Sequence, residues 1–396
     1  MMLRFQIKQY QVLKFLLVLE FINYLLTTSF LNQLTTTIDI VLAVCFIIHY
    51  QFALKTKKIS GGALILLTVL LIKVCIAENI YDCFLRASSL FVQMVLMYEL
   101  PYQEIKQINN VEETFIVPTA LIITKIVSLV TILNFIIISY SKMANIYILF
   151  GYKIGEPING RYNGFFRTDA FCSELALICL IFFSIFYQKR RISISSFVYL
   201  ASLGTIWLTG TRAAMVASAV FCFIILVDKS RKIDKKAIKW FSIVALSIIL
   251  LGVIWVGGYS YLDRISSSRW SIWATILKDS IEKIGFLGMN DLEVSATING
   301  IVYSGGTHNA FIQLIYNMGF IFTLLMIAYL ITRLRKDRNI STNKKMINAK
   351  IIAGITAIIV FSFFEAHLFF FRCLISFSLW FLLLVYNIYR MSSEGK

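Results

Sequence analysis

The sequence predicts an all-α membrane protein that crosses the lipid bilayer many times. Hydrophobic residues make up 59% of the 396 residues and charged residues only 15%, whereas a soluble domain is usually about 45–50% apolar and about 25% charged. Apolar stretches of membrane-spanning length recur along the chain, without the alternation that strands of a membrane β-barrel require. No polar stretch is long enough to fold alone, so we expect a single integral membrane domain over residues 1–396.

The apolar stretches predict about twelve spans, most of them long enough to cross about 30 Å of hydrocarbon as a helix. The stretch from 193 to 227 is too long for one span, and Gly210 supplies the backbone freedom for a turn between two. The expected spans are Leu13–Phe30, Ile38–Leu54, Ala63–Ala77, Cys83–Tyr98, Thr114–Tyr140, Ala170–Tyr187, Ser193–Gly210, Thr211–Val227, Trp240–Gly258, Asn309–Ile331, Ile351–Glu365 and His367–Tyr389.

The distribution of lysine and arginine predicts which loops face the cytoplasm. If the N-terminus is cytoplasmic, alternate loops, above all 229–239 and 333–350, hold most of the 38 basic residues, as the positive-inside rule requires. We therefore expect a multi-pass protein of the plasma membrane with both termini in the cytoplasm. The net charge of +17 is explained by these loops, so membrane lipids are expected partners and nucleic acid is not.

The two longest loops on the outer side are then 141–169 and 259–308, and they are unusually rich in arginine for outer loops. A single arginine at a membrane surface is ordinarily an anchor. Several arginines converging on one face instead suggest an anionic ligand, because the planar guanidinium binds phosphate oxygens in pairs. The candidate anion-binding residues are Arg161, Arg167, Arg212, Arg264, Arg269 and Arg372, and we expect Arg161, Arg212 and Arg269 to converge.

The segment 269–284 predicts an amphipathic helix in the second outer loop. Trp270, Trp273 and Leu277 recur at helical spacing, with charged residues elsewhere around the helix. We expect this helix to lie at the outer membrane interface, with its aromatic stripe serving packing rather than sugar binding.

His308 lies in the turn Gly305-Gly306-Thr307-His308-Asn309, just before an apolar span. A histidine there can transfer protons or bind phosphate, because its pKa lies near neutrality; the alternative is a structural cap. Farther on, Glu365 and Arg372 are seven residues apart and can form an ion pair that braces the last outer hairpin.

Metals and cofactors are not expected. No His, Asp or Glu residues have metal-ligand spacing, the seven cysteines contain no CxxC pair, and no P-loop or GxGxxG motif occurs.

The polar motifs, taken in order, resemble those of the O-antigen polymerase and ligase superfamily of membrane glycosyltransferases (Wzy- and WaaL-like). The resemblance covers about Arg161 to Phe320. It rests on Arg161 with Gly164-Phe165, on Thr209-Gly210-Thr211-Arg212, on Arg269 and Trp273 followed by two glycines, and on His308-Asn309 before Asn317-Met318-Gly319.

This resemblance implies a GT-C-like helical fold and a polyprenyl-diphosphate-linked oligosaccharide substrate at the outer membrane face. It implies a repeat-unit polymerase of a capsule, exopolysaccharide or O-antigen type, with other polysaccharide assembly proteins as potential partners. Catalysis would fall to His308, Arg212 and Arg269, without a metal. The alternatives are a ligase that moves the finished polymer to another acceptor, a flippase for the lipid-linked oligosaccharide, and a non-catalytic assembly scaffold.

Overall fold

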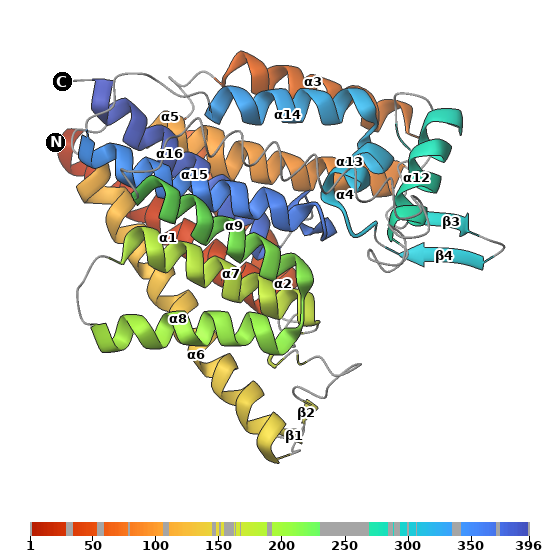
Figure 1. The fold of residues 1–396 in the computed structure, drawn as a ribbon. Coiled ribbons are helices and arrows are strands. Elements are labelled where there is room, and N and C mark those ends of the chain that lie inside the picture. Colours follow the sequence, from red (N-terminus) through yellow and green to blue (C-terminus); the bar gives the residue numbers. More distant parts are fainter. Residues whose placement is uncertain are drawn as a thin grey trace.

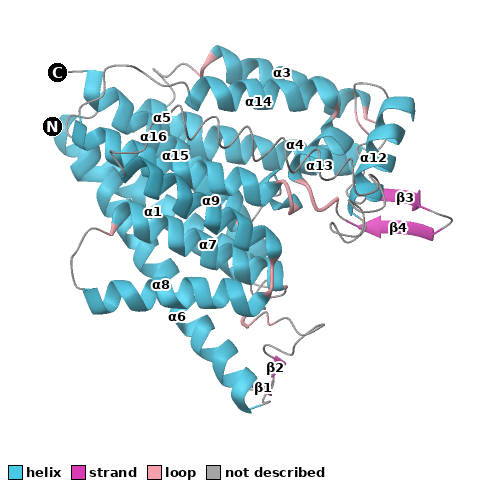
Figure 2. Cartoon of the chain, viewed as in Figure 1, coloured by secondary structure: helices cyan, strands magenta, loops and turns pink. Residues whose placement is uncertain are grey.

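The structure is a computed structural model, and its described part is predominantly helical (Figure 2). Strands are confined, in this part of the chain, to two short antiparallel hairpins. The described residues are 2–28, 35–53, 59–77, 80–105, 111–144, 148–149, 152–153, 162, 164–166, 168–187, 192–229, 269–283, 288, 294–298, 301–305, 307–334, 342–369 and 373–394.

Long helices built from the apolar stretches form the body of the molecule (Figure 1). In the first half they are α1 (Met2–Thr28), α2 (Thr35–Ala53), α3 (Gly61–Ile76), α4 (Ile80–Phe91), a π-helical segment Val92–Glu99, α5 (Leu100–Ile105), a second π-helical segment Glu112–Ile116 and α6 (Val117–Ala144). The hairpin β1 (Ile148–Leu149) and β2 (Tyr152–Lys153) follows.

The second half begins with α7, which starts at the capping side chain of Thr168. Its elements are α7 (Asp169–Phe186), α8 (Ile192–Thr209), α9 (Arg212–Lys229), α12 (Arg269–Lys283), β3 (Val294–Ile298), β4 (Ile301–Gly305), α13 (Ala310–Met318), α14 (Phe320–Leu334), α15 (Thr342–Ser362), the short 3-10 helix η5 (Ala366–Phe369) and α16 (Leu374–Glu394).

Most expected spans that fall on described residues appear as helices at about the expected positions. The turn between α8 and α9 is where the sequence placed it, and Gly210 has the positive φ of 64° that such a turn requires. The expected span Trp240–Gly258 lies outside the described residues.

Two expected spans are wrong in their extent. The stretch Asn309–Ile331 is not one helix. Helix α13 ends at Met318, and Gly319, with a φ of 89°, interrupts the helix before α14 begins. The last span starts at Leu374 rather than His367, because residues 366–369 form the separate helix η5. These breaks place α13 and η5 at one end of the bundle, where they carry polar side chains.

The hydrophobicity of the helices indicates a membrane protein. Within the described ranges, four helices are long and apolar enough to cross a bilayer, at Gln11–Thr28, Glu112–Lys142, Asp169–Phe186 and Leu374–Met391, and shorter apolar helices accompany them. Helices α7 and α16 are almost entirely buried, whereas α8 exposes large side chains such as Leu200 and Trp207. Such an apolar outer surface suits contact with lipid.

The two ends of the bundle differ. Both chain termini lie at one end, here called the terminal end, and α12, α13, β3 and β4 lie at the opposite end, here called the distal end (Figure 1). At the terminal end, Arg333 of α14 pairs with the fully buried Glu99 and lies over the rings of Tyr98 and Tyr329. Buried charge at that end is therefore paired, as burial requires.

Candidate functional site

The amphipathic helix predicted from the sequence is α12, and it packs on α13 at the distal end. Ile272 and Ile276 of α12 form a small apolar cluster with Ile312 and Tyr316 of α13. The indole of Trp273 donates a hydrogen bond of 2.6 Å to the carbonyl oxygen of Thr307. The apolar stripe thus serves packing, and it fixes Arg269, the first residue of α12, beside the turn that carries His308.

The turn around His308 is fixed on both sides by hydrogen bonds. Asn309 is the N-cap of α13: its side-chain oxygen accepts from the backbone N–H groups of Phe311 and Ile312 at 3.0 and 3.1 Å. On the other side, the backbone N–H of Thr307 donates to the side chain of Gln313 at 3.0 Å. The structural cap is therefore Asn309, and His308 is not needed for that task.

His308 also has a strained backbone. Its φ is +51°, and it is the one non-glycine residue with positive φ in the described part of the chain. Such conformations carry an energetic cost in non-glycine residues and persist where the surroundings impose them, often at functional sites. The side chain of His308 is 44% exposed, so the ring is held at the surface of the distal end.

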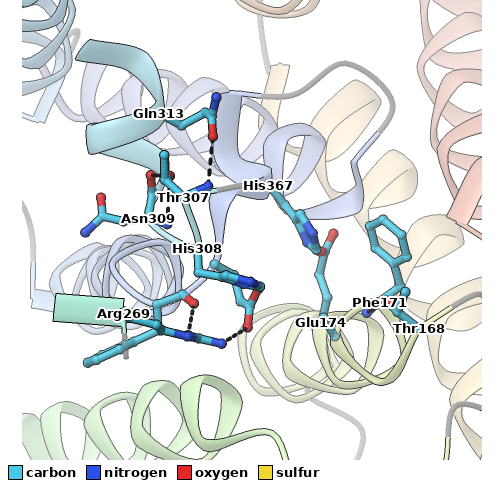
Figure 3. Close-up of polar contacts among 12 residues, drawn as sticks. Thr168, Phe171, Glu174, Arg269, Thr307, His308, Asn309, Gln313 and His367 are labelled. Carbon is cyan, nitrogen blue, oxygen red and sulfur yellow. Dashed lines mark hydrogen bonds and ion pairs between the residues drawn. The ribbon is translucent and has the colours of Figure 1, made fainter. Parts of the chain in front are cut away.

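Glu365, between α15 and η5, contacts both Arg269 of α12 and His308, which lie close together in Figure 3. Its carboxylate is 3.5 Å from a terminal nitrogen of Arg269 and, through the other oxygen, 3.5 Å from Nδ1 of His308. Arg269 also donates to the carbonyl oxygen of Phe364 at 2.5 Å. The expected partner of Glu365, Arg372, lies outside the described residues, so the ion pairs shown for Glu365 are those with Arg269 and His308.

The electrostatics favour an ionised Glu365. Burial raises the pKa of this carboxyl group, but the hydrogen bond from His308 and the positive charges of His367, Arg269 and His308 outweigh burial, and the net pKa is below its ordinary value. A carboxylate at Nδ1 orients the imidazole of His308 and leaves Nε2 to accept a proton, the arrangement expected of a general base.

A second histidine–carboxylate pair lies next to this cluster. Nδ1 of His367, in η5, is 3.0 Å from the buried carboxylate of Glu174 in α7. The His367 ring stacks on Phe171, with ring centres 4.6 Å apart. Burial lowers the pKa of His367, but the hydrogen bond and charge of Glu174, with the charge of Glu365, raise it to a net value above the ordinary one.

The structure brings together two of the predicted site residues, Arg269 and His308. Arg212 begins α9 and is exposed, and the α8–α9 turn lies at the distal end (Figure 1). Arg161, Arg167, Arg264 and Arg372 lie outside the described residues. The predicted convergence of Arg161 with Arg212 and Arg269 therefore stays a prediction.

Two acidic residues of the site were missed or misread in the sequence. Glu174 was not singled out, although an acidic residue inside an apolar span is itself a functional signal. Glu365 was paired with Arg372, because spacing along one helix reveals only local neighbours, whereas Arg269 is 96 positions away in sequence.

No group of three His, Cys, Asp or Glu side chains suited to hold a metal ion occurs in the described ranges. No protein-family model matches the chain. No curated protein matches it significantly.

Proposed function

We propose that the protein is a repeat-unit polymerase that transfers glycan from a polyprenyl-diphosphate donor to a lipid-linked acceptor at the outer face of the plasma membrane. The observation that carries the proposal is the meeting of His308 and Arg269 on the buried carboxylate of Glu365. This cluster lies at the bundle end opposite the chain termini, so with cytoplasmic termini it faces outward.

The reaction requires one bond to form and one to break at the anomeric carbon of the donor sugar. A hydroxyl oxygen of the acceptor attacks that carbon, and the bond between the carbon and the diphosphate oxygen breaks. The diphosphate leaves with the electron pair, and Nε2 of His308 takes the proton of the hydroxyl group. Glu365, hydrogen-bonded at Nδ1, holds the ring and stabilises the imidazolium that forms.

The leaving diphosphate carries negative charge that arginine donors can stabilise without a metal ion. Arg212, exposed at the first residue of α9, is a candidate for this role. Arg269 is partly engaged by Glu365 and by the carbonyl of Phe364. We therefore assign Arg269 a dual role, in which it orders Glu365 and contributes positive charge near the leaving group.

The placement of buried charge bears on the flippase alternative. A flippase is expected to carry polar groups along an interior path through the bundle. Among the described residues, the buried ion pair Arg333–Glu99 lies at the terminal end, and the clusters of Glu365 and Glu174 lie at the distal end. These ion pairs lie at the ends of the bundle, which favours chemistry at one surface. Glu20, buried within α1, is the feature that suits a flippase, and the ligase remains the alternative on the same site.

The glycans of a strain that lacks the protein distinguish these functions. Loss of a polymerase leaves single repeat units on the lipid carrier at the outer face, and loss of a ligase leaves long chains that are not attached to their acceptor. Loss of a flippase confines lipid-linked units to the cytoplasmic face. We expect single outer units, restored to polymer by the wild-type protein and not by His308→Ala. Unchanged glycans would contradict the proposal.

A further inference from the structure

The pair Glu174–His367 has no role in the reaction as described, yet it is built into the same corner of the molecule (Figure 3). Glu174 is fully buried in the second turn of α7, and one of its oxygens is 3.0 Å from Nδ1 of His367. Its other oxygen accepts a hydrogen bond of 2.6 Å from the backbone N–H of Ile375, in the first turn of α16. One carboxylate therefore binds η5 and the start of α16.

The segment held in this way is the segment that carries Glu365. Glu365 lies two residues before His367, between α15 and η5. Ser376 adds a hydrogen bond from its hydroxyl group to the carbonyl oxygen of His367 at 3.2 Å. Because α7 supplies Glu174 from a different part of the chain, the pair fixes the position of the Glu365 segment against the body of the bundle.

A contact that only holds the segment in place does not require ionisable side chains in the buried interior. Burying a carboxylate removes its hydration, and apolar residues of similar volume pack as well or better than many buried ion pairs. A charged pair retained inside an apolar span is instead a sign of function. The adjacent Glu365 supplies that function, because its charge orients His308.

We propose that Glu174 and His367 are positioning residues for the proposed reaction: they hold the Glu365 segment in place, and the positive charge of His367 keeps Glu365 ionised against His308. This inference rests on the proposed function of His308. Glu174 and His367 act through Glu365 and do not touch the substrate.

The charge of His367 depends on its surroundings, which several elements supply. The carboxylates Glu174 and Glu365 favour the protonated ring, and burial opposes it. Other ionisable groups act on these two carboxylates or on their neighbours. They are Arg269 and His308 beside Glu365, and Cys373 beside Glu174 with Arg86 near Cys373.

The proposal predicts a basic limb in the pH–rate profile. The pKa of His367 is raised, so the ring stays protonated to a higher pH than an ordinary histidine, whose pKa is about 6.5. Above the folded-state pKa the positive charge is lost, Glu365 loses a stabilising neighbour, and turnover falls.

The test is the pH–rate profile of purified protein with a lipid-linked repeat unit, for wild type, Glu174→Gln and His367→Gln. Removing the charge of Glu174 should move the basic limb to lower pH by about one to three pH units, the effect of losing an adjacent opposite charge. His367→Gln still donates a hydrogen bond through its amide but does not titrate. It should lower turnover and abolish the basic limb.

A matched control is Glu104→Gln. It breaks the His49–Glu104 pair, which is also buried, has a nitrogen–oxygen distance of 3.1 Å and involves α5 near the terminal end (Figure 1). We expect its profile to coincide with that of wild type. If Glu174→Gln and His367→Gln lower the rate at every pH while the basic limb stays in place, the pair is structural and the proposal is overturned.

A second readout separates failure of this inference from failure of the proposed function. Amide hydrogen exchange at residues 365–369 and at Ile375 reports how firmly the segment is held, whether or not polymer forms. Protection in wild type should fall as pH rises through the pKa of His367, and in Glu174→Gln it should fall at lower pH. If wild type makes no polymer, the proposed function fails alone. If protection in Glu174→Gln matches wild type at every pH, the positioning role fails.

Discussion

At the scale of the residue, the clearest functional signal is the difference in structural role between His308 and Asn309. Asn309 caps α13 and also donates from its side-chain nitrogen to the carbonyl oxygen of Phe363 at 3.1 Å. His308 takes the strained φ of +51° and leaves its ring half exposed beside Glu365. A strained backbone at a residue that does no structural capping is explained if the ring has a chemical task.

We predict opposite phenotypes for substitutions at these neighbouring positions. His308→Asn should fold normally, because asparagine tolerates left-handed backbone, while its turnover falls by roughly 10²–10⁴-fold through loss of the general base. Asn309→Ala should lower stability by about 1 kcal/mol through loss of the cap. Thermal unfolding in detergent, paired with turnover per folded molecule, checks both. A fully active His308→Asn would remove His308 from the mechanism.

Glu365 and His367 also predict how stability depends on pH. The pKa of Glu365 is lowered by folding, so its contribution is present above about pH 4.3, the pKa of a free glutamate, and is lost as pH falls through the folded-state pKa. The pKa of His367 is raised, so its contribution is complete below about pH 6.5 and is lost as pH rises through the folded-state pKa. The combined contribution of these two groups to the free energy of unfolding is therefore largest between about pH 4.3 and about pH 6.5.

The measurement is the unfolding midpoint across this pH range. In Glu365→Gln the unfolding midpoint should fall less steeply as pH is lowered, and in His367→Gln it should fall less steeply as pH is raised. Identical pH dependence in wild type and both variants would show that neither group is linked to folding.

At the scale of the element, the sequence predicted the helices well where the apolar pattern is interrupted by polar or glycine-containing turns. The α8–α9 turn at Gly210 and the helix α12 both follow from local patterns. The break between α13 and α14 could not be predicted from the local pattern, because a single glycine inside an apolar run is common in membrane helices and does not by itself end them. Tertiary contact explains this break.

That contact is the close approach of Gly288 to the chain at Gly319. Gly288 has a φ of 76°, and a Cβ atom on it would lie 2.5 Å from the backbone nitrogen of Gly319 and 2.9 Å from the carbonyl oxygen of Asn317. Its own carbonyl oxygen accepts a hydrogen bond of 2.9 Å from Lys73 of α3. Residue 288 therefore links α3 to the α13–α14 break.

We predict that Gly288→Ala destabilises the protein, because backbone atoms cannot move aside and positive φ strains alanine, at a cost of about 1–3 kcal/mol. Gly61→Ala is the matched control, since a Cβ there meets nothing within 4 Å. It should leave the unfolding midpoint unchanged or raise it slightly. Equal midpoints for the two variants would show that the approach at Gly288 does not constrain the fold.

At the scale of the whole molecule, the sequence indicated a helical membrane protein with a polar outer end, but it did not indicate which charges meet there. Arg269, His308 and Glu365 come from three separate segments, and the packing of α12 and η5 against α13 brings them together. Periodicity and spacing describe neighbours within one helix. They therefore predicted the elements and missed the Glu365 cluster.

The orientation is tested by labelling single cysteines with a membrane-impermeant maleimide, in a background without the seven native cysteines. Lys278 of α12 and Asp228 near the end of α9 are exposed at opposite ends of the bundle. We expect Lys278→Cys to react from outside intact cells and Asp228→Cys to react only after the membrane is opened. The reverse pattern would place the Glu365 cluster in the cytoplasm and contradict an outer-face reaction.

The most direct test of the central claim is polymer formation by the purified protein supplied with lipid-linked repeat units. Wild type should convert single units into a ladder of longer lipid-linked chains and release the free lipid diphosphate, with a chelator present. His308→Ala should produce the ladder roughly 10²–10⁴-fold more slowly. Single units that stay unextended with folded wild-type protein, or a ladder made equally fast by His308→Ala, would contradict the account.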